Sequence, residues 1–141
     1  MSGAAGCRFC AVVAGGLAAQ LVLEDAATVA FLDRRPLFPG HCLVVPRAHH
    51  ETLGDLPLEL LEPLFATVRR LAVAVQRAMG AAGSFVAINN RVSQSVPHLH
   101  VHVVPRNPKD GLRGFFWPRT TYPDEAAAAA VRDRIRAALA G

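Results

Sequence analysis

The sequence lacks any apolar run that approaches the length of about 20 residues needed to cross a bilayer. It has only three cysteines, an odd number that argues against a disulfide framework and for free thiols or a metal site in a reducing compartment. Its first six residues are uncharged and contain neither the basic nor the apolar region of a secretory signal. These absences lead us to expect a cytoplasmic protein without a membrane-spanning segment.

Charged residues are also few, at 18% against 52% hydrophobic residues, which is typical of a folded globular chain. The formal net charge is +4, but lysine and arginine are scattered, with no basic run and no aromatic platform beside them. This pattern disfavours nucleic acid as a main partner. A small anionic ligand needs only a few local positive groups and fits the composition better.

A length of 141 residues suits one domain with a sizeable core. No repeat, linker or low-complexity boundary divides the sequence. We expect residues 1–6 to form a flexible tail and residues 7–106 to form the main domain. Residues 107–141 are expected to form a C-terminal loop and helix that pack on the same domain.

Five segments rich in β-branched and other apolar residues are predicted to be strands. They lie at 21–24, 28–33, 41–46, 85–89 and 98–104. The third is almost wholly apolar and is therefore expected at the centre of the sheet. Because short turns connect most of the strands, we expect an α+β fold with an antiparallel sheet.

Apolar residues at three- and four-residue steps predict a long amphipathic helix at 63–79. Pro63 is expected at its start, after a short turn, because proline is poorly tolerated inside a helix, and Gly80 is expected just beyond its end. A short helical segment is predicted at 7–14, and an alanine-rich helix at 124–140.

Histidine alternates with apolar residues in the stretch 98–104. Successive side chains of a strand point to opposite faces, so three imidazoles are expected on one solvent-accessible face and the apolar residues on the core face. The three histidines are His98, His100 and His102. Three interpretations are open at this point: a metal site, a nucleophile whose neighbours set its tautomer, or surface histidines of an edge strand. We expect Pro105 to end the strand because it has no N–H to donate.

The motif Gln-Ser-Val-Pro-His-Leu-His-Val-His-Val-Val at 94–104 resembles the signature of the histidine triad family of nucleotide hydrolases and transferases. Segments 30–33, 39–41 and 45–49 match that family's pattern at the expected separations, so the likeness spans residues 7–106. It is a likeness to bacterial-type members and, to a lesser extent, to the fragile histidine triad branch. The resemblance implies the histidine triad fold, an antiparallel five-stranded sheet with one long helix and a C-terminal helix.

By that resemblance His100 is the nucleophile, which attacks the α-phosphorus of a nucleoside phosphoramidate or a dinucleoside polyphosphate to give a nucleotidyl-histidine that water hydrolyses. Imidazole suits this role because its pKa of about 6.5 leaves much of it neutral at pH 7. His102 and Ser95 are expected to bind α-phosphate oxygens, and Gln94 to lie near the leaving group or the attacking water. His98 completes the expected catalytic set. Transfer of the nucleotide to a phosphate acceptor, or nucleotide binding with little turnover, are the alternatives.

The resemblance also implies where a purine nucleotide is held. Asp33 corresponds to the residue that accepts hydrogen bonds from the ribose hydroxyls, which suits a carboxylate because it is acceptor-only when ionised. Phe9 and Phe31 correspond to apolar walls around the base, with Val12 and Leu17 beside them or simply in the core. For His41 the resemblance implies a hydrogen-bonding support near the triad strand.

Two loops bear on the choice of substrate. The loop before Gln94 departs from the family pattern because it is shorter and lacks glycine; we prefer Asn89 as its phosphate-contacting residue, with Asn90 as the alternative. The segment 107–123 either closes over the substrate or forms a packed surface loop or dimer contact. The residues that would reach the substrate from it are Arg113, Arg119 and Trp117.

Cys7 and Cys10 form a Cys-x-x-Cys pair, and with His49 and His98 they make a Cys₂His₂ set that would satisfy a tetrahedral zinc ion. Bacterial-type members of the family place such a zinc beside the triad. The resemblance therefore implies a structural zinc that clamps the N-terminal segment onto the sheet. The alternative is a pair of buried thiols. Family likeness further suggests a homodimer.

Overall fold

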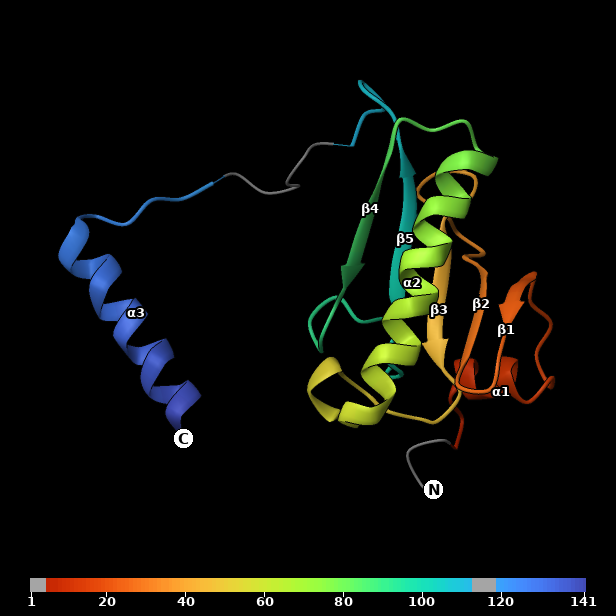
Figure 1. Ribbon diagram of the computed structural model, residues 1–141, viewed down its shortest axis with the longest axis horizontal. Coiled ribbons are helices and arrows are strands. Elements are labelled where there is room, and N and C mark those ends of the chain that lie inside the picture. The colour runs from red at the N-terminus through yellow and green to blue at the C-terminus, as the bar shows by residue number, and fades with distance from the viewer. Residues whose placement is uncertain (1–4, 113–118) are drawn as a thin grey trace. The chain divides into compact units, whose positions relative to one another are not determined.

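The computed structural model describes residues 5–112 and 119–141. Figure 1 shows its helices and strands in chain order. They are α1 (Arg8–Val13), β1 (Leu21–Glu24), β2 (Thr28–Leu32), β3 (Cys42–Pro46), the 3₁₀ turn η2 (Leu53–Asp55), α2 (Leu58–Ala78), β4 (Gly83–Ile88), β5 (Val101–Arg106) and α3 (Glu125–Ala140). The chain divides into two compact units, Met1–Asp110 and Gly111–Gly141. No described helix is both long and apolar enough to cross a membrane.

The five strands form one antiparallel sheet in the order β1-β2-β3-β5-β4. This confirms the predicted fold class: an α+β protein with a five-stranded antiparallel sheet, one long helix and a C-terminal helix. β3 lies in the middle of the sheet, and all of its residues are buried, as its apolar sequence predicted. The neighbouring strand, β5, carries His102, and His98 and His100 directly precede it in the chain.

Helix α2 lies across one face of the sheet and packs against β3 and β5 (Figure 1). Leu64, Val68, Leu71 and Val75 recur on one side of the helix, and they bury the apolar stripe that the periodicity predicted. The residues that meet them are Ala30, Cys42, Val44, Val101 and Val103 of the sheet and Leu99, which lies just before β5. These alternate positions all point to one face, so the intervening residues, including the triad histidines, point to the other.

The opposite face of the sheet is covered by α1 and the segment after it. Val12 of α1 packs there with Val29 and Phe31 of β2 and with Leu43 and Val45 of β3. Strand register places Phe31 opposite Leu43, and Leu43 opposite His102 of β5. This row of three side chains crosses three strands and brings an aromatic ring and a triad imidazole to the same face.

Helix α2 begins at Leu58, so the prediction of a turn followed by a helix from Pro63 is wrong. Pro63 lies inside the second turn and lacks the N–H that would bond the carbonyl of Glu59. Leu60 and Leu61, which precede the proline, pack against the core. Their burial offsets one missing hydrogen bond close to the start of the helix, which is why the proline does not mark its beginning.

Strand β5 runs from Val101 through Pro105 to Arg106, and the prediction that it starts at residue 98 and ends at the proline is wrong at both ends. Pro105 pairs with Ser84 of β4, whereas the ladder with β3 stops two residues earlier, at Val103. Without a second neighbouring strand, a missing N–H leaves no ladder bond unmade on that side. Residues 98–100 instead lead into the strand without belonging to it, and the N–H of Leu99 donates to the carbonyl of His50 at 2.7 Å.

The C-terminal unit contains α3, close to its predicted bounds. The carboxylate of Asp124 caps the helix by accepting a hydrogen bond from the N–H of Ala127 at 2.8 Å. The expectation that residues 107–141 pack on the main domain stays a prediction. Of the expected flexible tail, residues 1–4 lie outside the described part of the chain.

Replacing Gly40 by alanine is expected to destabilise the protein by about 1–3 kcal/mol. Gly40 has a φ of +98°, which side-chain-bearing residues rarely adopt, and an added Cβ would lie 2.6 Å from Cγ of Met79 and 3.3 Å from Cγ of Pro105. Urea denaturation measures the change. Gly16→Ala, where the added Cβ makes only an ordinary contact at 3.7 Å, is the matched control and should stay within about 0.5 kcal/mol of wild type. Equal losses in the two variants would contradict the strain argument.

Candidate active site and metal centre

The triad face of the sheet carries a cavity of about 370 Å³. Its apolar wall comes from α1, the segment that follows α1, β2 and β3. The apolar residues include Phe9, Val12, Leu17, Phe31 and Leu43. The polar and ionisable residues are Arg8, Asp33, Arg34, Arg35, Ser95, His100 and His102. An apolar wall beside a few convergent polar groups is typical of a small-molecule site.

His100 is held in one tautomer by the backbone. Its Nδ1 lies 2.8 Å from the carbonyl oxygen of His98, and because a carbonyl can only accept, Nδ1 carries the proton. Nε2 is then the nitrogen with the free lone pair. Burial lowers the pKa of His100, which keeps the ring neutral at pH 7. Phe9 packs edge-on against the imidazole, with ring centroids 5.0 Å apart, so the ring is held in the cavity wall. The arrangement leaves an oriented, neutral nucleophile.

His102 has the opposite tautomer, set by a chain of hydrogen bonds. The N–H of Leu37 donates to Nδ1 of His41 at 3.0 Å, so His41 carries its proton on Nε2. That proton is donated to Nδ1 of His102, at 3.0 Å. His102 therefore keeps its own proton on Nε2 and can donate it to an anionic ligand. Burial, helped by the neighbouring His100 and His41, lowers the pKa of His102 to about 4, so the ring acts as a neutral donor.

The hydrogen bonds from Leu37 through His41 to His102 argue against a metal ion between Asp33, His41 and His102, although the ligand atoms of these three residues lie within 4.8 Å of one another. His41 already accepts a hydrogen bond from the backbone at Nδ1. Binding a metal at Nε2 as well would leave the ring without any proton, as an imidazolate. Asp33, whose Oδ2 lies 3.6 Å from Nε2 of His41, is instead an acceptor beside the hydrogen-bond chain. This observation supports the predicted supporting role of His41.

The structure brings most of the predicted nucleotide-contacting residues to this cavity. Those that line it are Phe9, Phe31, Asp33 and Ser95. Asn89 and Gln94 are not among the described residues that line it. The side-chain amide of Gln94 is bonded at both ends to backbone, donating to the carbonyl of Glu51 at 2.6 Å and accepting from the N–H of Arg91 at 2.8 Å. Gln94 thus holds its loop in place, and the substrate roles of Gln94 and Asn89 stay predictions.

Asn90, the alternative to Asn89, has a structural bond of its own. Its Oδ1 accepts a hydrogen bond from the N–H of Leu53 at 2.9 Å, which ties the loop before the triad to η2. Of the residues proposed to reach the substrate from the C-terminal segment, Arg113 and Trp117 lie outside the described residues. Their expected contacts stay predictions, as does that of Arg119.

Sequence reasoning missed three arginines that line the cavity. Arg34 and Arg35 directly follow Asp33, and that adjacency is the signal that could have identified them. Arg8 lies between Cys7 and Cys10, where the pattern was interpreted for its two cysteines and for Phe9. Among the described lining residues, three arginines thus stand against one carboxylate, Asp33, so the charge of the cavity favours an anionic ligand.

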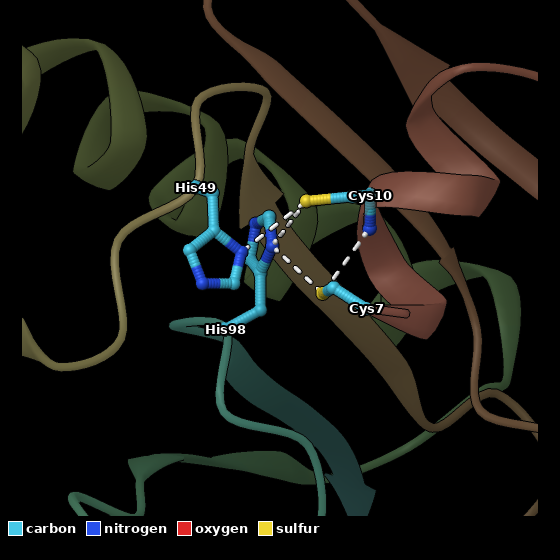
Figure 2. Close-up of side chains that lie close together, drawn as sticks. All are labelled: Cys7, Cys10, His49 and His98. Carbon is cyan, nitrogen blue, oxygen red and sulfur yellow. Dashed lines mark hydrogen bonds between the residues drawn. The ribbon is translucent and has the colours of Figure 1, made fainter. Parts of the chain in front are cut away.

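The four predicted metal ligands come together beside the triad (Figure 2). Their ligand atoms all lie within 4.8 Å of one another. Nδ1 of His98 is 3.5 Å from Sγ of both Cys7 and Cys10, and Nδ1 of His49 is 3.2 Å from Sγ of Cys10. Nε2 of His98 donates to the carbonyl of Pro46 at 2.9 Å, which leaves the Nδ1 lone pair facing the sulfurs. Two thiols and two imidazoles converging in this way are a donor set that suits tetrahedral zinc.

The cluster and the nucleophile share His98. The side chain of His98 points to the two cysteines, while its carbonyl holds the ring of His100. Both histidines are buried, with 0% and 3% of their surface exposed, so the expected solvent-accessible face of three histidines is wrong for two of them. The N-terminal segment and α1 cover the face that a bare strand would leave open, a long-range contact that strand periodicity cannot show.

Stability is expected to fall as the pH is lowered from 7 to 5. An unfolded histidine titrates near 6.5, whereas the pKa of His102 in the fold is about 4. The unfolded state therefore binds more protons between these two values, so the stability present above pH 6.5 is lost as the pH falls through this window. For His102 alone the loss at pH 5 is at most about 2 kcal/mol.

Chemical denaturation at pH 7 and at pH 5 measures this loss. The variant His102→Gln cannot titrate, so its drop in unfolding free energy should be smaller than that of wild type by up to about 2 kcal/mol. Identical drops in the two proteins would show that His102 is not held neutral by the fold.

Comparison with known proteins agrees with this geometry. The family model described as HIT domain matches residues 15–109, most of the chain. A HIT-like protein of Saccharolobus solfataricus is 38% identical over 101 residues, which are 70% of this chain and 73% of that protein. The bis(5'-nucleosyl)-tetraphosphatase of Schizosaccharomyces pombe is 34% identical over 93 residues, 64% of this chain and 51% of that enzyme. An adenylylsulfatase of Arabidopsis thaliana is 30% identical over 108 residues, 75% and 55% of the two chains.

Solved structures give the same result. A Streptococcus mutans protein matches with a TM-score of 0.83 and 31% identity, over 95% of this chain and 85% of its own. A zinc-bound histidine triad family protein from Mycobacterium smegmatis matches with a TM-score of 0.73 and 34% identity, over 93% and 99% of the two chains. The chain therefore belongs to the histidine triad (HIT) family, a family of nucleotide-binding hydrolases and transferases.

Proposed function

We propose that the protein hydrolyses nucleotides at the α-phosphorus through a covalent nucleotidyl-histidine on His100. The observation that carries this proposal is the tautomer of His100. Its Nδ1–H is bound to the carbonyl of His98, so Nε2 is the unprotonated nitrogen of a neutral ring that lines the cavity. The tetraphosphatase and adenylylsulfatase relatives, whose names describe hydrolysis of nucleotide phosphorus bonds, support the same chemistry.

The cavity offers a place for each part of a purine nucleotide. The base would lie against Phe9 and Phe31, whose rings meet edge-on at a centroid distance of 5.4 Å. Asp33, at the polar end, would accept hydrogen bonds from the ribose hydroxyls. The α-phosphate would then lie where the Nε2–H of His102 and the hydroxyl of Ser95 can donate to its oxygens.

The reaction would take place in two displacements. Nε2 of His100 forms a bond to the α-phosphorus while the bond to the leaving group breaks, and the leaving group departs with the electron pair. The ring is then a cation, and its Nδ1–H remains bonded to the carbonyl of His98, which stabilises that charge. Water next attacks the phosphorus, the P–N bond breaks, a proton is released, and the nucleoside monophosphate leaves a neutral His100.

We further propose that Cys7, Cys10, His49 and His98 hold a structural zinc ion. A bound zinc would supply no step of the reaction; it would fix the four side chains that join α1 to the start of the triad strand. Burial and the neighbouring Cys7 raise the pKa of Cys10 to about 11, so without a cation the Cys10 sulfur stays protonated and forms only weak contacts. The zinc-bound relative from Mycobacterium smegmatis supports the assignment.

The test is to incubate the protein separately with adenosine 5'-phosphoramidate and with diadenosine tetraphosphate. Release of AMP, together with a protein adduct heavier by one adenylyl group and located on His100 by mass spectrometry, would support the proposal. An adduct that resists water but passes to a phosphate acceptor would indicate a transferase. Nucleotide binding with neither adduct nor AMP would indicate a binding module and overturn the proposal.

The homodimer and the cytoplasmic location that the sequence suggests also stay proposals. The sheet ends at β1 and β4, and Val86 of β4 is 43% exposed although it is apolar. An exposed apolar edge strand is a surface that proteins commonly cover by association. Light scattering at several protein concentrations measures the mass and decides between one chain and two.

A further inference from the structure

A second cavity adjoins the one that holds the triad. It measures about 240 Å³ and lies between residues 5–8 of the N-terminal segment and residues 95–97 of the loop before the triad. Arg8, Ser95 and Val96 line both cavities, so the two meet at these side chains. Ser95 is the residue expected to bind the α-phosphate. The second cavity therefore begins where a nucleotide held in the first would end.

Arg8 places a positive charge at this junction. In the described part of the chain the structure gives the Arg8 guanidinium no carboxylate partner within 4.0 Å, whereas Arg47 and Arg106 are paired with Glu24 and Asp110. Arg8 is exposed to solvent, and it lines both cavities. No acidic residue is among the described residues that line the second cavity. A phosphate group in this position would meet an unneutralised guanidinium, which is suited to bidentate contact with phosphate oxygens.

We propose that the second cavity is the leaving-group subsite and that Arg8 binds the phosphate beyond the α-phosphorus. This inference rests on the proposed function and narrows its substrate class. The preferred substrates are nucleotides whose leaving group is itself a phosphate chain, such as dinucleoside polyphosphates. A phosphoramidate gains nothing from Arg8, because its nitrogen takes up a proton and leaves as neutral ammonia or a neutral amine, with no negative charge for a guanidinium to bind.

The same contact has a consequence for the first displacement. When Nε2 of His100 bonds to the α-phosphorus, the α-phosphorus–oxygen bond breaks and its electron pair stays on the bridging oxygen of the leaving phosphate chain. The negative charge of that chain increases by one as it departs. Arg8 therefore interacts more strongly in the transition state than in the ground state, and its removal should lower kcat as well as raise KM.

The experiment compares kcat/KM for diadenosine tetraphosphate with kcat/KM for adenosine 5'-phosphoramidate. In Arg8→Gln the ratio of the two values should fall at least about tenfold, because a charged hydrogen bond to one substrate alone is lost. Arg34→Gln is the matched control: it removes the same charge from a residue that lines only the first cavity. Both substrates place their nucleoside there, so this variant should lower the two values by the same factor and leave the ratio unchanged.

A second measurement needs no variant. Raising the ionic strength screens an exposed charge contact, so the ratio for wild type should fall with added salt, and Arg8→Gln should lose that dependence. Zinc content and thermal melting of Arg8→Gln show whether the neighbouring cysteines are disturbed; if they are, the salt dependence of wild type decides.

Two failures can be told apart. If wild type releases AMP through His100 but the ratio neither falls in Arg8→Gln nor responds to salt, the leaving-group subsite is wrong and the proposed function stands. If neither substrate yields His100-dependent AMP release, the proposed function fails, and the subsite fails with it.

Discussion

Replacing His100 by alanine is expected to lower kcat for AMP release by about 10³-fold or more, since removal of a covalent nucleophile leaves only binding and charge stabilisation to act on water. The loss comes from a single atom, Nε2 of His100. Nδ1 of His100 is engaged by the carbonyl of His98, so Nε2 supplies the lone pair, and alanine has none. Steady-state assays with both substrates measure the loss. The adenylyl adduct should disappear with the activity.

Two controls separate the loss of the nucleophile from damage to the fold. His100→Gly leaves a space into which free imidazole can diffuse, so added imidazole should restore part of the activity. His50→Ala removes another half-buried histidine that lies outside the cavity, and its kcat should stay within about twofold of wild type. AMP release by His100→Ala at the wild-type rate, or an adduct on another side chain, would exclude the covalent mechanism.

Replacing Cys10 by serine is expected to abolish zinc binding and to lower the melting temperature by about 10 °C or more. Sγ of Cys10 lies 3.2 Å from Nδ1 of His49 and 3.5 Å from Nδ1 of His98. Its loss therefore removes the ligand that contacts both histidines of the cluster. Because metal binding and folding are coupled, the binding free energy lost is also stability lost. Metal analysis and calorimetry of the purified protein measure the two effects, and chelator treatment of wild type should reproduce them.

Cys42→Ala is the matched control for the metal claim. Cys42 is buried in the core on the α2 side of the sheet, and its thiol donates to the carbonyl of Gly40 instead of facing the cluster. This variant should keep one zinc per chain even if it loses some stability. Wild type that holds no zinc after expression in zinc-supplemented medium, or Cys10→Ser that holds a full equivalent, would refute the site. Activity should also fall when zinc is removed, because His98 orients His100.

Residue patterns predicted the elements of the fold better than their ends. Apolar segments rich in β-branched residues identified the five strands, and a period of three to four residues identified the long helix, because these local patterns follow from backbone geometry and side-chain shape. The prolines were misleading. Pro63 lies within α2 because the burial of the preceding leucines offsets its missing hydrogen bond. Pro105 lies within β5 because no second strand pairs with it there, so its missing N–H leaves no ladder bond unmade.

For the candidate site, too, the residue types could be predicted from the sequence, whereas their contacts could not. Three alternating histidines, a Cys-x-x-Cys pair and a motif that resembles one family already indicate, from the residue order, which chemistry is available. What those groups can do depends on the contacts that they make in the folded chain. The tautomers of His100 and His102 depend on the carbonyl of His98 and on the N–H of Leu37 acting through His41.

The contacts that complete the site join residues far apart in the chain. Cys7 and His98 are 91 positions apart, and His41 and His102 are 61 apart. The cavity junction at Arg8 and Ser95 depends on the same closure of α1 over the sheet. Local patterns specify which face of a strand a side chain takes, but burial, proton position and charge depend on what lies opposite, and only the packed chain determines that.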